Sequence, residues 1–320
     1  MSAAALRRSA VWAERDIDVA IPPDFMLASG DRSADGRVRC RLIGARGGPQ
    51  VLALGGISAG RDVCGARGWW RETLIDAGAL DLECTGLIGL DFAPLGDQRV
   101  RITPDDQARL IELALDALGV ASLHAFVGAS YGGMVGLAFA ARAPERLERL
   151  CVISASHKPS ALGAAWRGVQ RRIVEYGLAH GDGDGGLVLA RQLAMTTYRS
   201  AEEFEQRFGA GLDSSGRAAV DGYLEARGRA YPEVMLPRRW LSLSEAIDRH
   251  AVEPASIRTP VTLIGCDSDQ LVPLADVEAL AHALPNLNAF HRIQSIYGHD
   301  AFLKEPAKIA ALVRQALENN

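Results

Sequence analysis

Paired cysteines are missing from this sequence, which has only five cysteines among 320 residues. No two of them form a C-x-x-C pair, and each stands alone in a different part of the chain. Isolated cysteines argue against a disulfide framework and against a thiolate metal site, and they favour a reducing compartment. The sequence therefore predicts no bound metal. The five residues are Cys40, Cys64, Cys84, Cys151 and Cys266.

Long apolar runs and blocks of basic residues are missing as well. No apolar segment approaches the length needed to cross a membrane, and the formal net charge of -4 is spread without a Lys/Arg cluster. The segment Met1 to Ala20 carries Glu14, Asp16 and Asp18, which fits neither a signal peptide nor a transit peptide. We expect a cytoplasmic protein that binds neither nucleic acid nor membranes and acts on small molecules.

The composition provides for a large core, with 48% apolar and 23% charged residues. Short apolar runs bounded by Gly, Asp or Pro predict strands that are buried on both faces. Helical patterns lie between several of them, and one begins with Thr103 as N-cap and Pro104 in the first turn. This alternation predicts an α/β fold with a mainly parallel sheet and helices on both faces. The predicted strands are Val38 to Ile43, Val51 to Leu54, Gly86 to Leu90, Leu123 to Val127, Leu150 to Ser154, Val261 to Gly265 and Ala289 to Ile293.

The alternation stops between Lys158 and His250, where helical patterns follow one another around a Gly/Asp-rich break at Gly181 to Gly186. A helical insertion between two strands would lie over the strand ends, where α/β sheets keep their sites. We therefore predict a core formed by residues 1–157 and 251–320, and a helical cap formed by residues 158–250.

The strongest chemical motif is G-x-S-x-G around Ser130, a tight turn that presents a serine between a strand and a helix. Gly56 to Gly60 matches the same pattern around Ser58, but no helical pattern follows it. Ser58 is therefore interpreted as part of a loop, and Ser130 as the nucleophile. Backbone N–H groups of Ile57 and Tyr131 are the predicted oxyanion hole.

A serine nucleophile needs a histidine base and an acid that orients it, in the chain order Ser, Asp or Glu, His. His299 lies on a loop after the last predicted strand and satisfies this order, while His157 is its one serious competitor. Asp267 and Asp269 both follow the strand that starts at Val261. Position alone leaves the choice between these two aspartates open.

At these residues the sequence resembles the homoserine O-acyltransferase family of α/β hydrolases. Ser295 to Leu303 is similar to the family's S-x-x-G-H-D-A-F-L segment, and Asp267 to Pro273 places the family's acid on Asp269. Further similar pieces extend from the first strands through the cap. They are Gly68-Trp69-Trp70, Gly132-Gly133-Met134, Val169-Gln170-Arg171, Thr197-Tyr198-Arg199-Ser200 and Tyr223-Leu224.

The resemblance also implies substrate-binding residues. Arg171 would bind the substrate carboxylate and Asp300 the amino group, with Tyr198 as a further cap-pocket residue. These types suit an amino acid, because arginine offers a planar two-pronged donor to a carboxylate and an anion complements an ammonium group. Arg61 or Arg71, beside the oxyanion loop, is the candidate for the free carboxylate of a succinyl group.

Two departures from the family pattern bear on the identity of the acyl donor and acceptor more than on the catalytic triad. The segment Asp91 to Gly96 replaces the usual Gly/Cys-rich stretch, and Tyr131 stands where methionine is usual.

The predicted function is that of an acyl-CoA:L-homoserine O-acyltransferase in methionine biosynthesis, working through an acyl ester on Ser130. Succinyl-CoA is slightly favoured over acetyl-CoA, no cofactor is expected, and the resemblance implies a homodimer. The alternatives are an L-serine O-acyltransferase, a serine hydrolase of esters or thioesters, and a non-catalytic binding protein.

Overall fold

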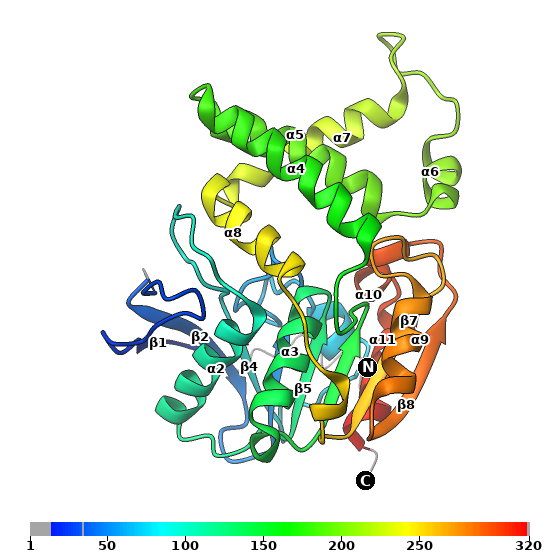
Figure 1. Cartoon of the computed structure of the whole chain (residues 1–320). Helices are drawn as coiled ribbons and strands as arrows, with labels where there is room; N and C mark the ends of the chain where they lie inside the picture. Colours follow the sequence, from blue (N-terminus) through cyan, green and yellow to red (C-terminus); the bar gives the residue numbers. More distant parts are fainter. Residues whose placement is uncertain (1–13, 34, 319–320) are drawn as a thin grey trace.

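The computed structural model describes residues 14–33 and 35–318, and its centre is an eight-stranded sheet (Figure 1). The strand order is β1-β2-β4-β3-β5-β6-β7-β8. β1, β2 and β4 pair antiparallel, and all other neighbours pair parallel. The strands are β1 Glu14–Ala20, β2 Arg37–Gly44, β3 Gln50–Leu54, β4 Gly86–Leu90, β5 Ala125–Ala129, β6 Leu150–Ile153, β7 Val261–Cys266 and β8 Leu287–Ile293.

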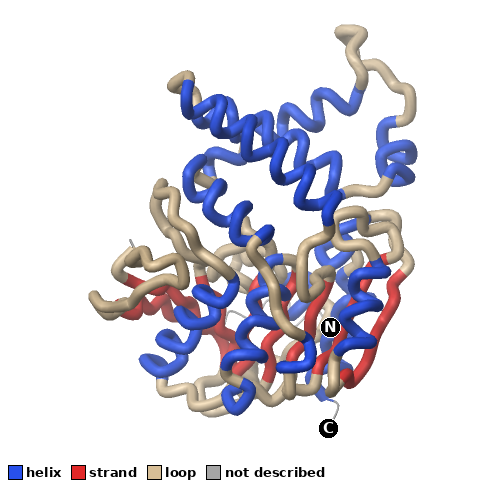
Figure 2. Tube along the Cα trace, in the orientation of Figure 1, coloured by secondary structure: helices blue, strands red, loops and turns tan. Residues whose placement is uncertain are grey.

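Helices cover both faces of this sheet (Figures 1 and 2). Alternate side chains of β3 enter different cores, because successive residues of a strand point to opposite faces. Leu52 joins α2 and α3 on one face, while Val51 joins η1 and α11 on the other. The predicted α/β-hydrolase class, with a mainly parallel sheet, is thereby confirmed. The covering elements are η1 Glu72–Asp76, α2 Pro104–Leu118, α3 Tyr131–Arg142, α9 Leu274–Ala283, α10 Ala301–Lys304 and α11 Pro306–Glu318.

Five α-helices separate β6 from β7, and Figure 1 shows them at one end of the sheet. Within the described ranges, none of the helices is long and apolar enough to span a membrane. The five are α4 Ala161–Ala179, α5 Gly183–Tyr198, α6 Ala201–Phe208, α7 Ala219–Arg229 and α8 Pro237–Asp248.

The glycine-rich break between α4 and α5 is shorter than the sequence suggested, because α5 already begins at Gly183. Asp182 caps it by accepting a hydrogen bond of 2.8 Å from the N–H of Gly185. A Cβ atom on Gly186 would lie 2.9 Å from the carbonyl oxygen of Ile173 in α4. These glycines therefore serve close helix contact rather than a long flexible loop.

β1 was not predicted from the sequence, because its outward residues are charged and it lies at the edge of the sheet. Ion pairs across the strands hold it to β2. Arg41 donates to Asp16 at 2.6 Å, and Asp18 lies 3.2 Å from Arg37. Cross-strand pairs of opposite charge stabilise such an edge and keep it from pairing with other chains.

The predicted start of α2 is confirmed, and it includes a buried carboxylate. Asp106 is fully buried. It accepts hydrogen bonds from the Thr103 N–H (3.0 Å), the Thr103 hydroxyl (2.8 Å) and the Ala28 N–H (2.7 Å). One side chain thus caps the helix and ties down the loop that follows β1.

Replacing Asp106 with Ala should lower the free energy of unfolding by about 3 kcal/mol, because α2 loses its buried cap and the N–H groups of Thr103 and Ala28 lose their acceptor. Asp105 is the matched control, since its half-exposed side chain pairs with Arg142 on the surface, at 3.3 Å. Asp105→Ala should cost less than about 1 kcal/mol. Urea unfolding followed by circular dichroism measures both, and equal losses would contradict the capping role of Asp106.

Candidate active site

Ser130 lies in the tight turn between β5 and α3, with φ 56° and ψ -122°. This left-handed backbone is strained for a serine and is maintained by its surroundings. A Cβ on Gly128 would lie 2.4 Å from the carbonyl oxygen of Gly132, and one on Gly132 would lie 2.3 Å from that of Leu54. Only glycines fit on either side, so the motif meets the geometric requirement of a nucleophile turn.

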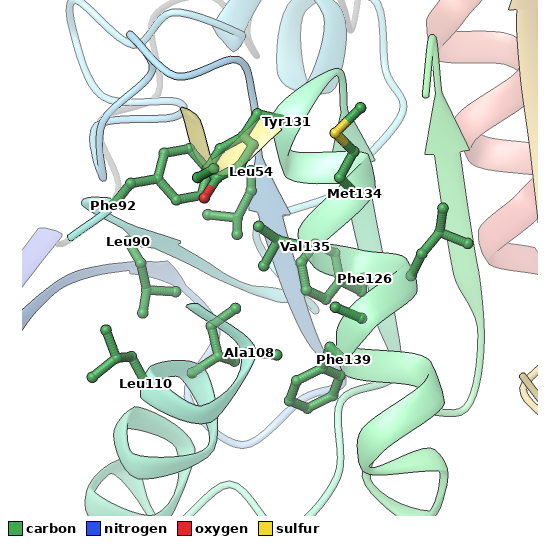
Figure 3. Close-up of a cluster of buried hydrophobic side chains, with 14 of the residues drawn as sticks. Leu54, Leu90, Phe92, Ala108, Leu110, Phe126, Tyr131, Met134, Val135 and Phe139 are labelled. Atoms are coloured by element: carbon green, nitrogen blue, oxygen red, sulfur yellow. The ribbon is translucent and has the colours of Figure 1, made fainter. Parts of the chain in front are cut away.

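The core behind the turn fixes its position. Figure 3 shows α3 packed against the sheet and α2, with Tyr131 beside Phe92. The two rings meet edge to face, with centroids 4.8 Å apart. The Tyr131 side chain is fully buried, and burial raises the pKa of its hydroxyl far above the ordinary value. The tyrosine at position 131, where the family usually has methionine, therefore changes the packing of the core, because its ring points inward.

Three side chains form a continuous hydrogen-bonded chain at the carboxyl ends of the strands. His299 Nε2 lies 2.8 Å from Ser130 Oγ, and His299 Nδ1 lies 2.7 Å from Asp269 Oδ2. The other oxygen of Asp269 accepts from the N–H groups of Leu271 (2.9 Å) and Val272 (3.0 Å). With its proton on Nδ1, the imidazole can accept the serine proton at Nε2.

The electrostatics of His299 suit a base. Burial alone would lower its pKa, but the charge of Asp269 and the hydrogen bond to it outweigh burial and raise the pKa above the ordinary value. The imidazole is therefore protonated below this raised pKa and free to accept a proton above it.

The competing residues lie elsewhere. His157 faces Ser156, with Nδ1 3.3 Å from its hydroxyl, and it does not line the cavity around Ser130. Burial and the neighbouring Lys158 lower the pKa of His157. Asp267 instead accepts a hydrogen bond of 3.2 Å from the N–H of Ser295.

The two expected oxyanion donors, Ile57 and Tyr131, both line the cavity with Ser130. The N–H of Gly132 donates to the Gly55 carbonyl at 2.8 Å, which fixes the glycine loop against the serine turn. Tyr131 opens α3, where the first N–H groups have no helical partner and point outward. The N–H of Tyr131 can thus face a developing negative charge, and the roles of Ile57 and Tyr131 as oxyanion donors stay a prediction.

The cavity has a volume of about 260 Å³. Residues from the sheet side and from the inserted helices line it together. A small acyl group and an amino acid match this size, because ligand sites are concave with a few placed polar groups. The polar cap residues among its lining are Arg167, Gln170, Arg191, Thr197, Tyr198 and Ser244.

Asp300 and Tyr198 lie at this cavity, as the resemblance implied. The Tyr198 ring is 6.0 Å from the His299 ring, between centroids. Asp300 Oδ2 lies 3.0 Å from Nε of Arg199, whose guanidinium also pairs with Glu203. Arg199, which is buried, therefore orients the carboxylate of Asp300 beside His299.

Arg171 is not among the residues that line the cavity. Its Nη1 lies 2.6 Å from Asp248 and 3.2 Å from the Ser244 carbonyl. Arg167, one turn earlier on α4, lines the cavity and donates to Asp248 at 2.7 Å. Arg167 thus lines the cavity and Arg171 does not, although both pair with Asp248, and the substrate-binding role of Arg171 stays a prediction.

Arg61 and Arg71 also lie outside the cavity lining, and contact of either with an acyl carboxylate stays a prediction. Arg61 pairs with Asp91 at 2.5 Å and with Asp16 at 3.2 Å. Arg71 donates to the Cys64 carbonyl at 3.1 Å. Asp91 belongs to the segment that departs from the family pattern, and its carboxylate draws Arg61 away.

Sequence reasoning missed Arg167, Arg191 and Tyr231. Tyr231 lies in η3, Tyr231–Glu233, and its hydroxyl is 2.7 Å from the Ser58 hydroxyl. The spacing of four residues between Arg167 and Arg171 was the one available signal, since residues so spaced share a helix face. No cluster of metal-ligating side chains occurs in residues 14–33 and 35–318.

Comparisons with known proteins agree with this fold and site. Residues 86–306 match the family model described as alpha/beta hydrolase fold, so the chain belongs to that class. A homoserine O-succinyltransferase of Xanthomonas campestris pv. campestris is 41% identical over 290 residues, which cover 88% of this chain and 79% of that protein. A homoserine O-acetyltransferase of Deinococcus radiodurans is 31% identical over 302 residues, covering 88% and 86%. Within its class, the chain belongs to the homoserine O-acyltransferase family.

Solved structures show the same fold. Homoserine O-acetyltransferase from Staphylococcus aureus superposes with a TM-score of 0.81 at 23% identity, covering 97% of this chain and 96% of that one. Esterase E22 superposes with a TM-score of 0.83 at 17% identity, covering 96% and 100%. Transferases and esterases thus share this architecture, so the two activities must be distinguished by the residues of the site.

Replacing Asp269 with Asn should remove the charge that raises the pKa of His299. The inflection of kcat/KM for a p-nitrophenyl ester, below which activity is lost, should move to lower pH. The maximal rate should fall by about 10⁴-fold, because an amide no longer holds the reactive tautomer. Asp267→Asn is the control and should leave both nearly unchanged. If Asp267→Asn gave the larger loss, the assignment of the acid to Asp269 would be wrong.

Proposed function

We propose that this protein is an acyl-CoA:L-homoserine O-acyltransferase of methionine biosynthesis, with succinyl-CoA as its donor. The observation that carries the proposal is the hydrogen-bonded chain of Ser130, His299 and Asp269. It opens into a cavity whose charged lining residues are Arg167, Arg191 and Asp300. Its relatives named above include transferases for both acyl groups.

The first stage acylates the serine. Ser130 Oγ attacks the thioester carbonyl while its proton passes to His299 Nε2. The N–H groups of Ile57 and Tyr131 stabilise the oxyanion. The C–S bond then breaks, and the departing CoA sulfur takes the proton from His299, which leaves an acyl ester on Ser130.

The second stage transfers the acyl group. The hydroxyl of L-homoserine gives its proton to His299 and attacks the ester carbonyl. The bond to Ser130 Oγ breaks, and the serine recovers its proton from His299. We expect Asp300, next to the base, to bind the ammonium group and Arg167 on α4 to bind the carboxylate, and the presence of both in the cavity lining supports this.

We further propose that residues 158–250 form a cap that keeps water from the acyl ester. Side chains of α4, α5 and α8 line the cavity above Ser130. Exclusion of water until the amino acid arrives distinguishes a transferase from a hydrolase with the same triad. A cytoplasmic location is supported by the cysteines, all five of which are free thiols.

Thiol release from succinyl-CoA should be slow without L-homoserine and fast with it, because the acyl ester waits for its acceptor. A thiol reagent follows the reaction, and Ser130→Ala should abolish it. Acetyl-CoA and L-serine are tested in the same way. CoA release at the same rate with and without L-homoserine would identify a thioesterase. CoA release that is accelerated only by L-serine would identify a serine acyltransferase.

A homodimer is the assembly we propose, and the exposed face of α4 supports it. Leu162, Val169 and Tyr176 are 55%, 41% and 68% exposed. Their spacing of seven residues, about two helical turns, places them in one apolar stripe. Such a stripe is the kind of surface that a second copy of the chain would cover.

Val169→Glu with Tyr176→Glu should convert the homodimer to a monomer, because buried unpaired charges oppose association. Sedimentation velocity measures the mass. Leu212→Glu, at an equally exposed position away from α4, should leave the dimer intact. A wild-type monomer, or a dimer that survives the double change, would contradict this interface.

A further inference from the structure

A cluster of three charged side chains lies beside the cavity, where α5 ends and α6 begins. Asp300 lines the cavity, and its Oδ2 lies 3.0 Å from Nε of Arg199. The same guanidinium donates from Nη1 to Oε1 of Glu203. Arg199 and Glu203 are 6% and 7% exposed, and neither lines the cavity. Both can therefore act on a bound substrate only through Asp300.

The junction between α5 and α6 is bonded to the two loops that carry the acid and the base. Gln270, on the loop after β7, donates from Nε2 to the carbonyl of Arg199 at 3.0 Å. The Ser200 hydroxyl donates to the carbonyl of Ile296, on the loop after β8. These bonds fix the main chain on both sides of the guanidinium, so it approaches Asp300 from a defined direction.

Two carboxylates share the single guanidinium of Arg199. Arginine keeps its charge in a protein, so a carboxylate that was its only partner would be neutralised by it. Glu203 supplies a second anion, and the cluster as a whole keeps one negative charge. Because the cluster is shielded from water, this charge acts at a longer range than it would in solvent. Asp300 is the member that presents it to the cavity.

We propose that Glu203, acting through Arg199, is a positioning residue that preserves the negative charge of Asp300 and thereby sets the affinity of the site for the amino group of the acceptor. The proposal rests on the proposed function, in which Asp300 binds the ammonium group. Arg199 holds one carboxylate oxygen, and the second oxygen remains for the substrate. Without Glu203, the arginine that orients Asp300 would also cancel its attraction for an amine.

The kinetics of a two-stage transfer separate the two substrates. The value of kcat/KM for the acyl donor reports the acylation of Ser130, and that for the acceptor reports the transfer from it. Glu203→Gln keeps the shape of the side chain and removes its charge. It should lower kcat/KM for L-homoserine by about tenfold and change the value for the acyl-CoA by less than about twofold. Glu202→Gln, at the exposed neighbouring position on α6, makes the same change of charge and should alter neither value.

A deaminated acceptor tests the role of the amine. 4-Hydroxybutyrate has the hydroxyl and the carboxylate of L-homoserine but lacks the amino group. Its inhibition constant in competition with L-homoserine should not rise in Glu203→Gln, because it has no ammonium group for Asp300 to attract.

Substitutions of Arg199 test the orientation of the carboxylate. Arg199→Met should lower kcat/KM for L-homoserine by about 100-fold, because Asp300 loses its partner. Arg199→Lys restores a cation without the planar fork and should recover part of this loss. Labelling of Ser130 by a fluorophosphonate at the wild-type rate confirms that each variant is folded with an intact triad.

Equal losses for donor and acceptor in Glu203→Gln would overturn the proposal and assign the cluster to supporting the loop of His299. An unchanged kcat/KM for L-homoserine would overturn it as well. Equal weakening of 4-hydroxybutyrate and L-homoserine would also overturn it, because the effect would not depend on the amine. A wild-type protein that is labelled at Ser130 but transfers no acyl group to L-homoserine would instead remove the proposed function itself.

Discussion

The hydrogen bond between Ser130 and His299 depends on the parallel register of the sheet. β5, β7 and β8 run in the same direction, so the loops that follow them leave from one edge. Ser130 follows directly after β5, and Asp269 and His299 lie on the loops after β7 and β8. Buried strands hold these loops in place, because a shifted strand would move its apolar side chains out of both cores. The same packing that stabilises the fold thus aligns the proton relay.

Much of this framework could be predicted from the sequence, because it depends on local signals. The strands that are buried on both faces appear as apolar runs, and β4 was predicted with its observed bounds, Gly86 to Leu90. The capping residues at Thr103 fixed the start of α2. The turn around Ser130 has sterically required glycines, so its motif and its geometry agree. β1 has none of these signals, because charged pairs with β2 stabilise it rather than apolar burial.

The cap arginines could not be placed from sequence, because their direction depends on packing between distant elements. Arg167 and Arg171 share a helix face and both pair with Asp248 on α8, yet only Arg167 lines the cavity, which depends on how α4 packs against α8. Arg191 can be recognised as a site residue only once α5 lies beside η3, where its guanidinium stacks over the Tyr231 ring. The sequence placed Arg61 beside the oxyanion loop, but its guanidinium forms ion pairs with Asp91 and Asp16. A motif specifies residue types, whereas the partner of each charge is a property of the tertiary structure.

The contact between Gly132 N–H and the Gly55 carbonyl has a further consequence. It joins the two segments that carry the proposed oxyanion donors, Ile57 and Tyr131, and it involves main-chain atoms alone. A substitution in these segments that keeps both glycines therefore leaves this main-chain contact unchanged. Tyr131 illustrates this, because its ring fills the core while its amide keeps the position of the turn. Substitutions on the inserted helices can thus change which substrate fits the cavity while the main-chain contact between Gly55 and Gly132 stays the same.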